Sequence, residues 1–309
     1  GIALYRDDSF PVGKVDFLEV GPIDFEEFLW ATGNKRLADL LKSCDWDTIN
    51  AVKEKYERLL RLYYYVGGMP KMVGTYVASG DLALVRQEQL ALLAAYDNDF
   101  SKHAPITLVP RIRMVWQSVV AQLSRENKKF LFGLVKEGAR AREYEVALEW
   151  LFDAGLLSRV QRVSCGQLPL KAYLDLGAFK IYLLDVGLLC AMAELPASAV
   201  VDGSDLLGAF KGGLTEQYVQ QQLRSLGLTI HYWSAENSSG EVDFLLQMDG
   251  QIVPVEVKAE ENLHSKSLAA FCKRYDLHTA VRCSMSPFRD QAWMRNVPLY
   301  AVREFFRQS

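Results

Sequence analysis

Residues 240–258, GEVDFLLQMDGQIVPVEVK, decide the fold of the C-terminal part of the chain because they encode a β-hairpin. The dipeptide Asp249-Gly250 lies between two alternating apolar runs, which is a strong signal for a two-residue turn. With this turn, Met248 faces Gln251, and the register of both strands follows. One face of the hairpin is then a continuous apolar surface, formed by Val242, Phe244, Leu246, Met248, Val253, Val255 and Val257.

The polar face of this hairpin brings two carboxylates together. Counting back from the turn places Asp243 opposite Glu256 in a non-hydrogen-bonded pair, in which the Cα atoms are roughly 4.5 Å apart. Like charges in this position are destabilising unless they are neutralised, and carboxylate oxygens are ligands that Mg²⁺ prefers. We therefore expect a metal site at Asp243 and Glu256, with Lys258 beside it. The alternative is an ordinary exposed strand face on which Glu241 and Lys258 form a weak ion pair.

The composition is that of a globular protein, with 309 residues of which 50% are hydrophobic and 24% charged. This length predicts two or three domains. No apolar run reaches the roughly 18 residues of a membrane span, and the first residues do not read as a signal peptide, so we expect a soluble cytoplasmic protein without membrane contact. Five scattered cysteines without a C-x-x-C pair predict neither disulfides nor a zinc site. No catalytic triad is recognisable, which argues against an acyl-transfer hydrolase.

Charge is distributed unevenly along the chain. The net charge is −3, but residues 101–180 contain 13 basic and 7 acidic side chains between two acidic flanks. A basic segment of this kind fits a DNA-contacting surface. The alternative is a set of solvated helices, in which case a protein partner replaces the nucleic acid.

Three successive patterns predict a multi-domain chain that is α and then α/β. Residues 1–100 are mostly helical, because Asp24 and Glu27 form a capping box before an apolar stripe and a further helix follows over 81–96. Between them, Tyr63–Pro70 ends one helix with two glycines and a proline, and its tyrosine run is expected to pack in the core rather than stack on a ligand.

The middle pattern, over residues 101–200, predicts a winged helix-turn-helix. A helix over 143–157 precedes two expected strands, 158–163 and 171–175, around a turn at 166–169. Such a unit binds DNA through a helix in the major groove, or serves as a connector. Residues 201–309 complete the chain as an α/β unit with a helix over 214–223, the hairpin, a helix over 265–275, and strands at 228–233, 278–283 and 298–302.

The order of a helix with Glu216, a strand with Asp243 and the tripeptide Glu256-Val257-Lys258 resembles the PD-(D/E)xK nuclease superfamily. The resemblance implies a restriction-endonuclease-like domain with a mixed sheet over 201–309. It implies that Asp243 and Glu256 bind Mg²⁺, that Lys258 positions the attacking water, and that Glu216 is an auxiliary acid. The implied reaction is phosphodiester hydrolysis, with the metal activating water. Val242 stands where this superfamily has its name-giving proline.

Five further stretches give the whole chain a second resemblance, to bacterial and archaeal AAA-type ATPases that end in a nuclease-like domain of unknown function. They are Phe10–Phe17, Phe25–Phe28, Gly67–Pro70, Phe179–Leu189 and Gly213–Glu216. The resemblance implies that residues 1–100 are an ATPase remnant with a helical lid. Nothing in the chain matches G-x-x-x-x-G-K-[ST], so ATP is expected to bind only to an upstream part. The first hypothesis is thus a Mg²⁺-dependent nuclease attached to an ATPase, and the alternative is a non-catalytic DNA- or protein-binding module that regulates it.

Overall fold

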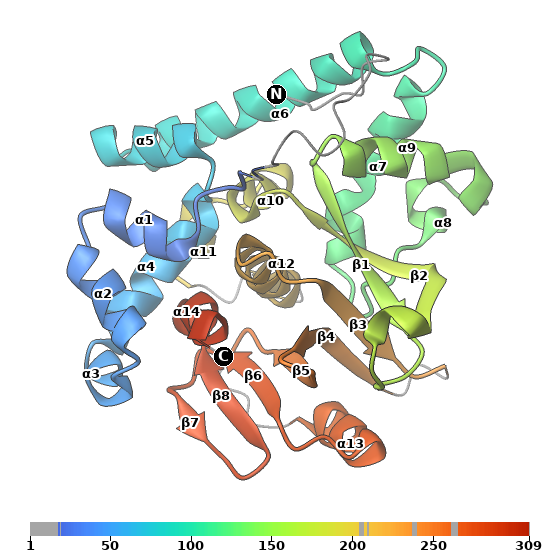
Figure 1. Ribbon diagram of the computed structural model, residues 1–309. Helices are drawn as coiled ribbons and strands as arrows, with labels where there is room; N and C mark the ends of the chain where they lie inside the picture. Colours follow the sequence, from blue (N-terminus) through green and yellow to red (C-terminus); the bar gives the residue numbers. More distant parts are fainter. Residues whose placement is uncertain are drawn as a thin grey trace.

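The computed structural model describes residues 18, 20–203, 207–208, 210–236, 240–260 and 265–308. Figure 1 shows helices that surround one side of a long twisted sheet. The Phe10–Phe17 stretch and the glycine-lysine pair within it lie outside the described residues. The first group of helices comprises α1 (Phe25–Ala31), α2 (Lys35–Ser43), α3 (Trp46–Ala51), α4 (Lys53–Val66), α5 (Pro70–Ser79) and α6 (Leu82–His103).

The middle of the chain adds helices and the first two strands. The elements are α7 (Val109–Leu123), α8 (Phe132–Val135), α9 (Ala141–Asp153), β1 (Leu157–Val163), a 3-10 turn (Leu170–Tyr173), β2 (Leu174–Leu183), α10 (Val186–Met192) and α11 (Ala197–Val201). A strand over 171–175 was the wrong expectation, because Leu170–Tyr173 form the 3-10 turn and the long strand begins only at Leu174.

The C-terminal part contains the remaining strands. Its elements are α12 (Phe210–Ser225), β3 (Ile230–Ser234), β4 (Glu241–Met248), β5 (Gln251–Val257), α13 (Lys266–Tyr275), β6 (Ala280–Ser284), β7 (Arg289–Asp290), β8 (Met294–Pro298), a 3-10 turn (Leu299–Ala301) and α14 (Val302–Gln308). The expectation of a strand over 298–302 was wrong, because β8 ends at Pro298 and the chain turns into α14.

All eight described strands form one mixed sheet in the order β2-β1-β3-β4-β5-β6-β8-β7. The β1-β2 hairpin joins the C-terminal strands through parallel pairing of β1 with β3, and this pairing runs only from Gln161↔His231 to Val163↔Trp233. The hairpin expected to be a wing therefore extends the sheet of the α/β unit. The division of the chain at residues 100 and 200 stays a prediction.

The β4-β5 hairpin has the register that its turn predicts, from Met248↔Gln251 to Phe244↔Val255. Asp249 and Gly250 both have positive φ, 47° and 75°, as a type I′ turn requires. Alternate residues of β4 lie in different cores, with Phe244 and Leu246 in the main core and Leu245 in the smaller core beside α13. The sheet is therefore covered on both faces around the hairpin.

The connector between α4 and α5 is held by a buried aspartate. Asp185 caps α10 through the Leu188 N–H at 2.9 Å and also accepts a hydrogen bond from the Gly68 N–H at 2.6 Å. Gly67 has φ +77°, and a Cβ there would lie 2.2 Å from Asp185 Oδ1. The connector thus packs directly against α10, and the adjacent tyrosines Tyr63, Tyr64 and Tyr65 are buried, as expected.

Helices α1 and α14 are joined by charged side chains. The expected capping box of α1 is confirmed, with Asp24 and Glu27 bonding reciprocally. Arg303 of α14 contacts Glu26 Oε2 at 2.9 Å and Glu304 Oε1 at 2.7 Å, and its Nε lies 2.7 Å from Asp24 Oδ2. The side chains of Glu26 and Glu304 are only 4% and 2% exposed. Two carboxylates therefore share one buried environment.

This pair makes stability depend on pH. Burial and the neighbouring Glu26 raise the pKa of Glu304 to about 7, whereas an unfolded glutamate titrates near 4.3. The folded state therefore keeps a proton that the unfolded state loses. We expect the contribution of Glu304 to the free energy of unfolding to be complete below about pH 4.3 and to fall, by at most about 1.4 kcal/mol per pH unit, as pH rises to 7.

Urea denaturation of the wild type and of Glu304→Gln at pH 5, 6, 7 and 8 measures this effect. The glutamine cannot lose a proton, so the difference in unfolding free energy between the two proteins should change with pH up to about 7 and then level off. Glu145→Gln, at an exposed position of α9, is the control and should show a constant difference. A constant difference for Glu304→Gln as well would contradict the assignment.

Candidate functional site

Glu216 of α12 is the centre of a buried group of charges. Its side chain is 4% exposed and contacts two lysines, Lys128 Nζ at 2.7 Å and Lys180 Nζ at 3.0 Å. The hydroxyl of Tyr182 donates a further short hydrogen bond to the same carboxylate. Burial alone would raise the pKa of Glu216, but Lys128 and Lys180 outweigh it and lower this pKa to about 2. Glu216 is therefore a charged, fully partnered carboxylate.

Lys180 connects this carboxylate to β4. Its side chain is 0% exposed, and its Nζ lies 2.5 Å from Glu241 Oε1 in addition to its contact with Glu216. The ammonium group also lies 4.9 Å from the ring centre of Tyr232. Burial lowers the pKa of Lys180, but the charges of Glu216 and Glu241 raise it by more. The pKa of Lys180 therefore lies above its usual value. Lys180 thus stays protonated inside the protein.

Asp243 lies at a bulge of β4. His231 pairs with Leu245 and Trp233 with Val242, so two residues of β4, Asp243 and Phe244, stand opposite one residue of β3. The ladder between β4 and β5 ends at Phe244↔Val255, one pair before Asp243 and Glu256. Asp243 Oδ2 instead accepts a hydrogen bond from the Val257 N–H at 2.7 Å.

The charge environment of Asp243 is dominated by the group around Glu216. Burial, followed by the charge of Glu216, raises the pKa of Asp243 to about 7, while Lys180 lowers it. The charge of Asp243 also raises the pKa of Lys258. Asp243 therefore stands between the Glu216 group and the end of β5.

Glu256 and Lys258 form a separate pair at the end of β5. Lys258 Nζ lies 2.9 Å from Glu256 Oε1, and the side chain of Glu256 is 9% exposed. Burial lowers the pKa of the Arg282 guanidinium on β6, and the charge of Glu256 partly offsets this effect. Arg282 is 1% exposed and donates to Asn296 Oδ1 at 2.9 Å.

The four predicted site residues thus occupy one region of the sheet but belong to two groups. Glu216 and Asp243 interact with Lys180, whereas Glu256 interacts with Lys258 and Arg282. We call the eight charged residues of the two groups the ionic cluster. Its members are the acids Glu216, Glu241, Asp243 and Glu256 and the cations Lys128, Lys180, Lys258 and Arg282.

The formal charges of the ionic cluster cancel, which bears on metal binding. Three of its acids already contact ammonium groups: Glu216 with both of its oxygens, and Glu241 and Glu256 with one oxygen each. A Mg²⁺ site needs free carboxylate oxygens. Among the described residues, no three His, Cys, Asp or Glu side chains are grouped so that they could hold a metal ion. Glu256 Oε2 is buried without a hydrogen-bond partner among the described residues, so a Mg²⁺ site at Asp243 and Glu256 stays a prediction.

Three cations of the cluster were not expected from the sequence. Lys128 follows α7 and Arg282 lies on β6, and neither position carries a local signal for burial. Lys180 and Tyr182 are two residues apart on β2, so their side chains lie on the same face of the sheet and can contact the same group. The sequence could not indicate that this face meets α12.

Comparisons with protein families match two parts of the chain. Residues 57–199 match the model of a domain of unknown function, DUF8612, and residues 211–301 match that of another, DUF4143. DUF4143 is typically found in proteins with an AAA-type, ATP-binding domain. No curated protein and no solved structure matches the chain significantly. Within the described part of the chain, no helix has the length and apolar character to cross a membrane.

Proposed function

We propose that this chain is a non-catalytic regulatory module of an AAA-type ATP-binding protein, and that it acts by binding a protein partner. The observation that carries the proposal is the ionic cluster, in which Lys180 occupies the space between Glu216 and Glu241. The DUF4143 match supports the association with an ATPase. ATP itself is expected to bind upstream of this chain.

A metal that bound to Glu216 or Glu241 would first have to break buried ion pairs. Removing one partner of a buried pair leaves an uncompensated charge and costs roughly 3–5 kcal/mol. Lys180 contacts two acids and Lys128 contacts the second oxygen of Glu216. The cluster is therefore better suited to fix β2 and the segment after α7 onto α12 than to hold a metal.

The basic segment supports a protein partner more than DNA. Two of its lysines, Lys128 and Lys180, form ion pairs inside the ionic cluster. Arg113 pairs with Asp97 outside the segment. Three of the six excess positive charges are thus paired with acids outside the segment.

The surface of α9 also favours a protein partner over DNA. In a winged helix the DNA-reading helix lies in the major groove between phosphates. Here the exposed positions of α9 include Glu145, Glu149 and Val146, which is 63% exposed. Carboxylates would be repelled by phosphates, so this helix suits a protein surface better.

Helix α6 offers a surface with few charges. It lies along the outer side of the molecule, between α5 and the α7–α9 group (Figure 1). The residues of highest exposure between 83 and 98 are uncharged; they are Ala83, Leu84, Gln87, Leu90, Ala91, Ala94, Ala95 and Asn98. The side chain of Asp97, which pairs with Arg113, is 43% exposed. Leu90 is 50% exposed. A helix face with few charges and exposed leucines favours contact with another protein.

One observation favours a nuclease as the second candidate. The carboxylate of Asp243 is bonded to the backbone of Val257, the middle residue of the Glu256-Val257-Lys258 tripeptide. The acid and the E-x-K strand are thus adjacent, as the PD-(D/E)xK resemblance requires. Nuclease activity would need the lysines to leave the carboxylates when a metal binds.

A cleavage and binding experiment separates these candidates. Purified protein is incubated with plasmid DNA or single-stranded RNA in the presence of about 10 mM Mg²⁺ or Mn²⁺. The variants Asp243→Ala and Lys258→Ala are assayed in parallel. We expect no more cleavage by the wild type than by either variant, and no DNA affinity that falls steeply with salt. Cleavage by the wild type that both variants lose would overturn the proposal and establish the nuclease. Strong salt-dependent DNA binding without cleavage would overturn the protein-partner part.

A further inference from the structure

Helix α6 carries apolar side chains on two opposite sides. Its inward side packs into the molecule through Val85, Gln89 and Phe100, each 0% exposed. On the outward side, Leu84 and Leu90 are 43% and 50% exposed. A surface helix normally presents charged and polar residues on the side that faces away from the core. The outward side of α6 therefore has the character of a second packing surface.

Six residues form the centre of this side, which we call the outer face of α6: Gln87, Leu90, Ala91, Ala94, Ala95 and Asn98. Their spacing places them along one side of the helix. The charged residues Glu88 and Asp97 lie at its borders, where they pair with Lys71 and Arg113. A partner would therefore meet leucine, alanine and amide groups at the centre.

The outer face is self-complementary about the midpoint of α6. The helix runs from Leu82 to His103, so its midpoint lies between positions 92 and 93. Three pairs of residues are equidistant from this point: Ala91 and Ala94, Leu90 and Ala95, and Gln87 and Asn98. In an antiparallel pair of two such helices around a two-fold axis at the midpoint, each residue faces the other member of its pair in the second copy.

The chemistry of the facing residues is compatible in this arrangement. Ala91 faces Ala94, which lets the two helices approach closely, and Leu90 faces the small side chain of Ala95. The side-chain amides of Gln87 and Asn98 each hold donors and an acceptor, so they can exchange hydrogen bonds. An isologous contact requires a surface that complements itself in this way.

The two ends of α6 carry opposite charges. Asp81 caps its start and Lys102 lies in its last turn, and both are exposed. In the antiparallel pair Lys102 is level with residue 83 of the second copy, about 3 Å along the axis from Asp81. Opposite charges thus meet at both ends, whereas a parallel pair would bring like charges together. The exposed apolar side chains of Val77 and Ile106 also lie beyond opposite ends of the helix.

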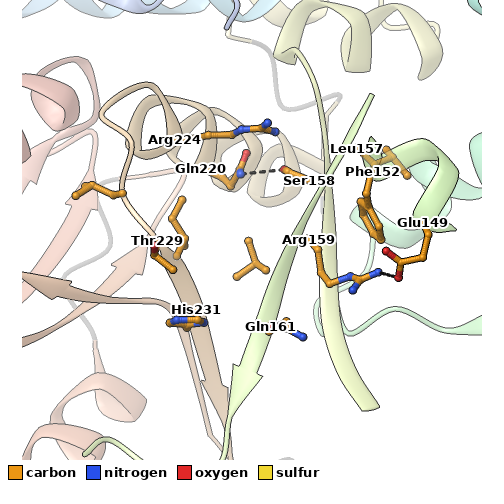
Figure 2. A pocket seen from close by; sticks show the side chains of 13 residues that line it. Glu149, Phe152, Leu157, Ser158, Arg159, Gln161, Gln220, Arg224, Thr229 and His231 are labelled. Atoms are coloured by element: carbon orange, nitrogen blue, oxygen red, sulfur yellow. Dashed lines mark hydrogen bonds and ion pairs between the residues drawn. The ribbon is translucent and has the colours of Figure 1, made fainter. Parts of the chain in front are cut away.

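Helix α9 also carries an exposed apolar side chain but does not suit pairing with itself. Its Val146 is 63% exposed. Glu145 precedes Val146, and Glu149 is held by Arg159 of β1 beside the gap between β1 and β3 (Figure 2). Two copies of this surface would bring carboxylates together, which is unfavourable. Val146 therefore provides a control position.

We propose that the outer face of α6 binds a second copy of this chain, with the two helices antiparallel around a two-fold axis at their midpoint. The 22 residues of α6 make a contact about 33 Å long. An interface built mainly on one pair of helices is small, so we expect a dissociation constant on the order of 10 μM. This inference rests on the proposed function, since it identifies the protein partner of α6 as another copy of the module. Such pairing would join two copies of the ATP-binding protein.

Sedimentation equilibrium over protein concentrations of about 1 to 200 μM tests the inference. We expect the wild type to shift from the mass of one chain to that of two. Ala91→Glu and Ala94→Lys, each studied alone, bring charge to the axis and should weaken association about tenfold or more. An equimolar mixture of these two variants should associate more tightly than either alone, because the new carboxylate on one chain faces the new ammonium on the other. Val146→Glu should associate like the wild type.

The mixture makes the test specific for the antiparallel register, and thermal denaturation shows whether each variant is folded. A wild type that stays monomeric at every concentration would overturn the inference. So would unchanged association of folded Ala91→Glu, no gain in the mixture, or an equal loss in Val146→Glu. The cleavage assay is independent of these results. A monomer that neither cleaves nor binds nucleic acid contradicts only the self-pairing, whereas cleavage that Asp243→Ala loses contradicts the proposed function.

Discussion

Replacing Lys180 by alanine is expected to lower the free energy of unfolding by about 3–5 kcal/mol. Lys180 is fully buried and contacts both Glu216 and Glu241, so its removal leaves two carboxylates with one fewer compensating charge. The control is Lys211→Ala, which removes an exposed ion pair with Glu260 and should cost no more than about 1 kcal/mol. Urea or guanidinium denaturation measures both values.

The same variant tests the charge balance of the ionic cluster. Without Lys180 the cluster has one excess negative charge, and the space between Glu216 and Glu241 becomes available to a cation. We expect Mg²⁺ or Ca²⁺ to restore part of the lost stability in Lys180→Ala and to leave the wild type unchanged. A loss below about 1 kcal/mol, or equal metal effects on both proteins, would contradict the structural role of Lys180.

Replacing Gly187 by alanine is expected to destabilise the protein by about 1–3 kcal/mol or more, because the site is already fully packed. An added Cβ would lie 2.6 Å from Gly67 N and 2.6 Å from Val66 O. Both contacts are with backbone, which cannot move aside like a flexible side chain. The α4–α5 connector would have to separate from α10, and the hydrogen bond from the Gly68 N–H to Asp185 would weaken.

Gly74 provides a matched control in α5. No atom lies within 4 Å of a Cβ at this position, and a glycine inside a helix is less favourable than alanine by roughly 0.5–1 kcal/mol. Gly74→Ala should therefore stabilise the protein slightly. Thermal denaturation measures the stability of both variants. A similar effect of the two substitutions would show that the connector is not tightly packed.

Local sequence signals predicted local structure well. The turn at Asp249-Gly250 determined the β4-β5 register, because a two-residue turn fixes which residues of the two strands face each other. The capping box before α1 is confirmed as well. The last expected strand failed because the apolar run 298–302 is short, and such a run suits a buried helix start as well as a strand.

The candidate site was predicted only in part. The positions of Glu216, Asp243, Glu256 and Lys258 in one region follow from a helix, a hairpin and a short motif. The metal site stays a prediction, since the sequence did not show that Lys128, Lys180 and Arg282 would reach these acids. Such contacts depend on how distant segments pack, which periodicity and spacing do not determine. The bulge at Asp243 is equally a result of packing between β3 and β4.

The contacts of Glu216 with Lys128 and Lys180 also have an evolutionary consequence. Three positions that are remote in the chain depend on one another, since a neutral residue at any one of them removes a compensating charge from a buried ion pair. Drift at one position is tolerated only with a compensating change at another. In related chains these positions should therefore vary together, as a single inherited unit that spans both family-matched regions.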